Sequence, residues 1–145
     1  MKQFVQKYFH RLYAYKSPPQ RSEVERKLLH GGPGDIPIVH TIYDTFVLWN
    51  SVMEKFPKPQ RYTLGETCSR YLLATLELLL GAATTSNSTE KSARLKDASA
   101  KVDTAKLLVR LCKDCKCITN VQYLQVESKL IDTGKMLGGW IKSMA

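Results

Sequence analysis

The sequence predicts an all-α fold, an antiparallel up-down-up-down four-helix bundle preceded by a short basic helical N-terminal extension. From residue 35 onward, apolar residues recur at spacings of three and four, and helix-capping residues precede several of these stretches. The sequence has no alternating pattern of Val, Ile and Thr that would predict a β-strand. The breaks between the stretches are short, and short connections favour antiparallel neighbours.

The chain divides at the loop HGGPGD, residues 30–35, because three glycines and a proline cannot continue a helix. Residues 1–34 carry seven Lys and Arg against two Glu, a net charge of +5. They have too little apolar surface to fold alone. We therefore expect a basic N-terminal extension and linker over residues 1–34 and a four-helix bundle over residues 35–145.

The first two predicted helices are bounded by Pro and capping residues. Asp35 can cap the first, with Pro37 in its first turn, and the FPKP turn at residues 56–59 ends it. The second begins at Pro59 or Thr63 and runs to Thr85. A capping-box pattern at 63–66 opens the helix if it starts at Thr63 and lies inside it if it starts at Pro59. The expected core positions are Val39, Ile42, Tyr43, Phe46, Trp49, Met53, Leu64, Cys68, Tyr71, Leu72, Thr75, Leu79 and Leu80.

The last two predicted helices each begin at a capping signature. Asn87 with Glu90 opens the third, which runs to about Lys116, and Thr119 with Gln122 opens the fourth, which reaches the C-terminus. The glycines at 134 and 138 each cost about 1 kcal/mol of helix stability, so we expect close approach of a neighbouring helix there. The expected core positions are Ala98, Val102, Ala105, Leu108, Val109, Cys112, Leu124, Leu130, Ile131, Leu137 and Ile141.

Composition places the chain among soluble globular proteins. Of 145 residues, 43% are hydrophobic and 24% charged, which excludes collagenous and wholly disordered classes. No apolar run is long enough for a membrane span, and the N-terminus lacks the apolar core of a secretory signal, so we expect a cytoplasmic protein without a membrane partner. The net charge of +9 indicates an acidic partner, most often nucleic acid.

The apolar faces of the second and third predicted helices are wider than a monomeric bundle needs. On the third, apolar residues sweep roughly 220° at 100° per residue, whereas a core-facing stripe needs little more than 100°. The excess favours burial between subunits. A docked tail, or simple exposure of Leu107 and Leu73, are the alternatives.

A strip of cations follows the polar side of the third predicted helix. Lys106, Arg110 and Lys113 lie within roughly 60° of one another on the helical wheel. Taken alone, the strip is more typical of a solvated face with local Asp–Lys pairs. In a basic chain it also predicts a phosphate-tracking surface. The candidate nucleic-acid-binding residues are Arg94, Lys101, Lys106, Arg110 and Lys113.

Catalytic motifs are missing from the sequence. It holds no G-x-S-x-G, H-E-x-x-H or P-loop pattern, so we expect no enzymatic activity, no catalytic residue and no cofactor. The spacing C-x2-C-x-C at residues 112–117 resembles a metal site, yet no His lies near it, and Cys112 and Cys115 fall on the apolar side of the helix. Buried structural thiols without metal are the favoured interpretation, and a metal or redox protein the alternative.

Four segments carry a resemblance to a known family: DIPI at 35–38, EKFP at 54–57, YTLG at 62–65 and GKMLGGWIK at 134–142. They resemble a small bacterial four-helix-bundle family that contains Avd, the accessory variability determinant of diversity-generating retroelements, and proteins encoded in intervening sequences of 23S rRNA genes. The resemblance covers residues 35–145. The stretch CSRY at 68–71 differs from the SIPSNIAEG-like stretch of the intervening-sequence branch, which places the chain nearer the Avd branch.

The resemblance implies a homopentamer with a basic surface that associates with a reverse transcriptase and with RNA or DNA. We therefore expect a non-enzymatic accessory protein of a diversity-generating retroelement. The alternative is an oligomeric scaffold or interaction protein of the intervening-sequence type, with no retroelement role.

Overall fold

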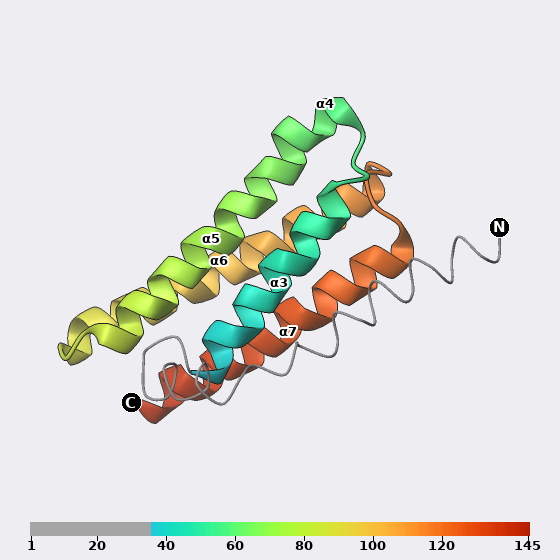
Figure 1. Cartoon of the computed structure of the whole chain (residues 1–145). Helices are drawn as coiled ribbons and strands as arrows, with labels where there is room; N and C mark the ends of the chain where they lie inside the picture. The colour runs from blue at the N-terminus through green and yellow to red at the C-terminus, as the bar shows by residue number, and fades with distance from the viewer. Residues whose placement is uncertain (1–35) are drawn as a thin grey trace, which may run out of the picture. The chain divides into compact units, whose positions relative to one another are not determined.

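The computed structural model describes residues 36–145, which are helical throughout with no strand among them (Figure 1). The all-α prediction is confirmed. Asp35, the basic extension and the predicted boundary at 34/35 lie outside the described residues, and the N-cap position of the first described helix is Ile36. The elements are α3 (Pro37–Met53), α4 (Lys58–Gln60), the π-helical turn η2 (Arg61–Gly65), α5 (Glu66–Thr84), α6 (Ser88–Asp114) and α7 (Asn120–Ser143).

The four long helices enclose one apolar core. Helix α5 packs on α6, α6 on α7, and α3 on both α5 and α7. At one end Cys68 near the start of α5 meets Cys112 near the end of α6, and at the other Gly81 near the end of α5 meets Arg94 near the start of α6. The largest fully buried side chains include Trp49, Ile42, Leu72, Leu79, Leu95, Leu130 and Leu137.

The buried stripe of α7 contains Leu130 and Leu137, as predicted, but differs at other positions. Leu124 and Ile131 were expected in the core but are exposed, and Tyr123 and Thr133 are buried instead. Thr133 is accommodated because its hydroxyl donates to the carbonyl of Lys129. Other predicted core residues are exposed, in the case of Tyr43, or half-buried, in the case of Phe46, Met53, Leu64, Tyr71, Leu80, Leu108 and Ile141.

A π-helical turn joins the short α4 to α5. The amide of Glu66 donates to the carbonyl of Arg61, five residues back, which is the hydrogen bond that defines a π-turn. Thr63 lies inside this turn and its hydroxyl contacts the carbonyls of Pro59 and Gln60, so 63–66 is not a capping box. The second helical segment therefore begins at Lys58, ahead of both predicted starting points.

The predicted caps of α6 and α7 are present. The Asn87 side chain accepts from the amide of Glu90, and Thr119 forms a full capping box with Gln122. Helix α6 ends at Asp114, two residues before the predicted end. Lys116 takes a left-handed conformation (φ 60°), and the amide of Cys117 donates to the carbonyl of Cys112 at 2.8 Å, which is a Schellman motif.

The glycines of α7 differ in their surroundings. A Cβ added at Gly134 would lie 3.2 Å from Nζ of Lys106, so a lysine side chain makes the close approach rather than a helix backbone. Around Gly138 and Gly139 the space is open, which overturns the expected helix approach within the part of the chain that the structure describes. No helix in residues 36–145 has both the length and the apolar character needed to cross a membrane.

Candidate nucleic-acid interface

The five predicted binding residues all lie on α6, but the structure divides them between its two flanks. Arg94 and Lys101 face α5, whereas Lys106 and Lys113 face α7. Arg110 lies four residues from Lys106, on the α7 side. The five therefore form two groups rather than one continuous strip, because the buried stripe of α6 places α5 and α7 on opposite sides of it.

The α5 flank holds its cations against neighbouring side chains. The guanidinium of Arg94 pairs with the carboxylate of Glu90 and lies against Gly81, where an added Cβ would require the guanidinium to move. Because of this ion pair, and because the Thr85 hydroxyl also donates to it, the pKa of Glu90 lies below its usual range. Nζ of Lys101 lies 4.8 Å from the ring centroid of Tyr71.

The α7 flank carries three cations in different settings. Nζ of Lys106 lies 3.6 Å from a carboxylate oxygen of Asp103, and that of Lys113 lies 4.5 Å from the ring centroid of Tyr123 and 3.9 Å from Asp114. Both lysine side chains are 31% exposed. The local Asp–Lys pairs expected from the sequence are therefore present.

Arg110 is the exception on this flank. It is exposed and makes no hydrogen bond or ion pair with the other residues of 36–145. A hydrogen bond with Glu127 and burial raise the pKa of the neighbouring Tyr123, and the charge of Arg110 lowers it. Arg110 is thus the cation of the five that is most available to a phosphate group.

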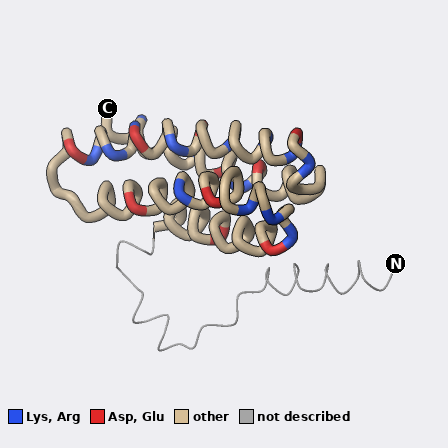
Figure 2. Tube along the Cα trace, turned by 90° about the horizontal axis from the view of Figure 1, so that it is seen from above, with Lys and Arg blue, Asp and Glu red and all other residues tan. Residues whose placement is uncertain are grey.

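Further cations, which sequence reasoning missed, lie at the same end of the bundle as Arg110 and Lys113. We call this the basic end and define it as residues 54–62 and 110–118. It holds six Lys and Arg against two carboxylates, a net charge of +4, while all of residues 36–145 carry +5. Figure 2 shows Lys and Arg positions at that end, on the right of the view, and others along the helices toward the opposite end. The residues missed are Lys55, Lys58, Arg61 and Lys116.

Two features of the fold bring the basic end together. Turn η2 packs against α6, and the connection after α3 lies beside the connection between α6 and α7 (Figure 1). Arg61 is held in place because its Nη2 donates to the carbonyl of Glu54 at 2.8 Å. The Lys and Arg around the FPKP turn were visible in the sequence, but only the tertiary contact of η2 with α6 places them near Arg110.

An exposed aromatic ring lies among these cations. Tyr62 follows Arg61 in η2 and is 72% exposed. Aromatic rings beside cations offer a stacking surface for unpaired bases, and the cations attract the phosphates. The basic end thus presents both kinds of group that bind single-stranded nucleic acid.

Apolar side chains are also exposed, as the wide helix faces predicted. Leu107 is 67% exposed on α6, with Leu111 one turn further along the helix, and Leu73 is exposed on α5. No described residue covers them. The exposed apolar residues of α7 are Val121, Leu124, Ile131 and Met136.

The cysteines do not form a metal site within residues 36–145. No three His, Cys, Asp or Glu side chains there lie close enough together to hold an ion. Cys68, Cys112 and Cys117 are buried, as expected of structural thiols. Cys115 was predicted on the apolar side but is exposed, because α6 ends one residue before it.

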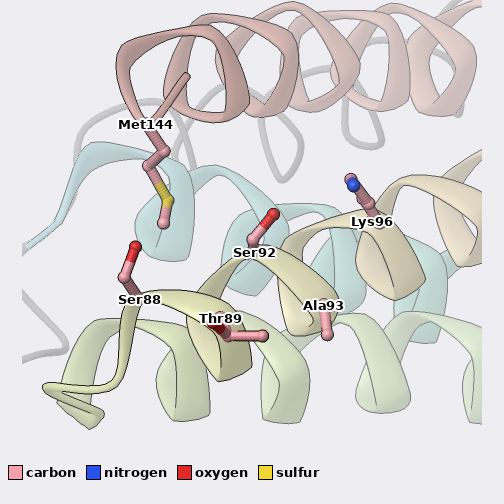
Figure 3. Close-up of a pocket in the computed structure, with 6 residues that line it drawn as sticks. All are labelled: Ser88, Thr89, Ser92, Ala93, Lys96 and Met144. Carbon is pink, nitrogen blue, oxygen red and sulfur yellow. The ribbon is translucent and has the colours of Figure 1, made fainter.

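A shallow open cavity of about 430 Å³ lies at the start of α6, away from the basic end (Figure 3). Met144 reaches over it from the C-terminal end of the chain. Its lining contains no His, Cys or carboxylate and therefore no pair of groups suited to acid–base or nucleophilic chemistry. The lining residues are Ser88, Thr89, Ser92, Ala93, Lys96 and Met144.

Comparison with known families gives one match. The family model described as bAvd-like matches residues 38–144, which include all the helices described above apart from the first residue of α3. No curated protein matches the chain.

Proposed function

Because the chain belongs to the bAvd-like family, we propose that it is a non-enzymatic accessory protein of a diversity-generating retroelement. It acts in the cytoplasm, binds RNA or DNA through basic surface and associates with the retroelement's reverse transcriptase. The observation that carries the nucleic-acid part is the basic end, which holds a net +4 of the +5 on residues 36–145.

The charge distribution supports binding by phosphate contacts. Lys and Arg that neutralise phosphates release condensed counterions, so affinity falls steeply with salt concentration. Lys106 and Lys113 keep nearby carboxylates at 3.6 and 3.9 Å, and such exposed pairs are weak enough for a phosphate to compete with them.

We also propose that copies of the chain assemble, as a homopentamer of antiparallel up-down-up-down bundles. The exposed Leu107 and Leu111 and the open surroundings of Gly138 and Gly139 support an interface between subunits. In a closed ring the fields of several basic ends add, which strengthens attraction of a polyanion.

Fluorescence anisotropy with labelled structured RNA and single-stranded DNA tests the binding surface. The variant combines Lys106→Glu, Arg110→Glu and Lys113→Glu. A matched variant makes the same charge change at exposed cations elsewhere, Arg70→Glu, Lys135→Glu and Lys142→Glu. We expect the first to weaken binding by about tenfold or more and to flatten the salt dependence, and the second to have a much smaller effect.

Equal losses in the two variants, or wild-type affinity that does not change with salt, would contradict binding at this surface. Circular dichroism of each variant checks that it is folded. The second partner is tested separately: the reverse transcriptase should co-purify with the wild-type chain, and failure to do so with both proteins folded would contradict that association.

A further inference from the structure

Two buried thiols face each other across the helix pair α5 and α6. Sγ of Cys68 and Sγ of Cys112 lie 3.9 Å apart, and both residues have no exposed surface. The separation is a thiol–thiol hydrogen bond in which either sulfur can donate. The two side chains come from adjacent helices and their sulfur atoms are in direct contact.

The hydrogen bond within the pair favours the thiolate form of Cys112, while burial opposes it. The hydrogen bond from Cys68 lowers the pKa of Cys112, and the same bond together with burial raises the pKa of Cys68. A thiolate is the nucleophilic form of cysteine, and its partner thiol then serves as the resolving group. The two sulfurs must approach by about 2 Å to reach the roughly 2.05 Å of a disulfide, so the two side chains and the helices that carry them must adjust.

We propose that Cys68 and Cys112 are a redox-active dithiol whose oxidation by a hydroperoxide forms a disulfide between α5 and α6. The Cys112 thiolate attacks one peroxide oxygen and becomes a sulfenic acid, and the other oxygen leaves as water or an alcohol. The Cys68 sulfur then attacks the sulfenic sulfur, the S–S bond forms as the S–O bond breaks, and the hydroxyl leaves as water with the proton of the Cys68 thiol. The two thiols lose two electrons and two protons, and a small thiol reductant reverses the step.

The position of Cys112 near the end of α6 provides access for a small oxidant. Only Lys113 and Asp114 follow it in the helix, and Asp114 and Cys115 are exposed. Helix ends open more readily than helix centres. The disulfide would then fix the start of α5 to the end of α6 across a separation of 44 residues.

Peptide mapping of the full chain tests the proposal, because trypsin places the four cysteines on four peptides. Their ranges are 62–70, 111–113, 114–116 and 117–129. The protein is treated with hydrogen peroxide while folded, alkylated in denaturant and digested. We expect a linked peptide that joins 62–70 to 111–113, lighter by two hydrogen atoms than the two separate peptides, and its loss after treatment with dithiothreitol.

A second variant isolates the pair. Cys115→Ser together with Cys117→Ala leaves Cys68 and Cys112 as the two thiols of the chain. On oxidation it should lose both alkylatable thiols without forming linked dimers, and its Tm should rise by roughly 5 °C or more, reversibly. Cys68→Ala should abolish the link.

Three results would overturn the proposal. They are full alkylation of Cys68 and Cys112 after oxidation, a link from Cys112 to Cys117, and links that join separate chains. If the double variant does not fold, the peptide map of the wild-type protein decides between these outcomes.

Discussion

The indole Nε1 of Trp49 donates a buried hydrogen bond to the carbonyl oxygen of Gly65, 3.2 Å away. The same carbonyl accepts from the hydroxyl of Ser69, also at 3.2 Å, and the ring of Trp49 meets that of Phe56 edge-on with centroids 5.7 Å apart. These contacts join the core of α3 to the end of η2. They therefore hold the turn that carries Arg61 and Tyr62 against the bundle.

Removal of the Trp49 donor should destabilise this junction. Trp49→Phe keeps an aromatic ring but removes the indole donor from the carbonyl of Gly65 and leaves a smaller side chain beside it. We expect a loss of about 1–3 kcal/mol in the free energy of unfolding, measured by urea titration with far-UV circular dichroism. Trp140→Phe, the same change at the half-buried second tryptophan, should cost less. A larger loss at Trp140 would contradict this account.

Lys116 occupies a conformation that suits glycine. Its φ of 60° places it at the C′ position of the Schellman motif after α6, where a Cβ is strained. Lys116→Gly and Lys116→Ala both remove the charge, but only glycine relieves the strain. The glycine variant should be more stable than the alanine variant by about 1 kcal/mol in urea titration. Equal stability of the two would show that the strain has no energetic effect.

The same pair of variants tests the role of the charge at the basic end. Both should bind labelled RNA more weakly than wild type and to the same degree, because both lose one cation. A residue retained at some cost in stability is typical of a functional position. Wild-type affinity in both variants would remove Lys116 from the binding surface.

Glu90 should make the stability of the start of α6 depend on pH. Arg94 and Thr85 lower the pKa of its carboxyl in the folded chain relative to the unfolded chain. The stabilisation is therefore present above the unfolded pKa and is lost as pH falls through the folded one. Glu90→Gln should lower the urea midpoint near pH 7, and its difference from wild type should shrink as the pH falls below the ordinary range of a glutamate pKa. If the difference in urea midpoint between Glu90→Gln and wild type is unchanged in acid, the stabilisation does not come from the ionised carboxylate.

Gly138 and Gly139 distinguish an isolated bundle from an assembled one. Both are exposed, with open space around the position of a Cβ. In an isolated chain, alanine at either site should stabilise α7 by about 1 kcal/mol. If subunits cover these glycines, Gly138→Ala with Gly139→Ala should also shift the chain toward smaller species in light scattering. An unchanged mass distribution would place the proposed interface elsewhere.

The fold class was predictable because it depends on local patterns. Side-chain spacings of three and four and the capping residues Asn87 and Thr119 act within a few residues, so they identified the helices and two of their starts. The π-turn at 61–65 was not predictable from local spacing, and its last residue, Gly65, lies against Met53 at the end of α3 and Phe56 in the connection that follows. The choice between Tyr123 and Leu124 for the core of α7 likewise depended on which face meets its neighbours.

The candidate site was predictable only in part, for a related reason. The cations of α6 could be read along one helix, but their division between the α5 and α7 flanks required the neighbours Tyr71, Gly81, Tyr123 and Gly134. Gly138 and Gly139 were recognisable in the sequence as glycines inside a helix. Only the structure shows that the space around them is open.

By itself, the sequence determined the helical class, the excess of positive charge and the excess of apolar surface, since all three follow from residue type and local spacing. Only the tertiary structure decided where the charge collects and which thiols meet. The packing of η2 on α6 brought Lys58 and Arg61 to the end that carries Arg110, and the pairing of α5 with α6 placed Cys68 3.9 Å from Cys112, 44 residues along the chain. Contacts between residues so far apart depend on how helices pack, and local spacing carries no information about that.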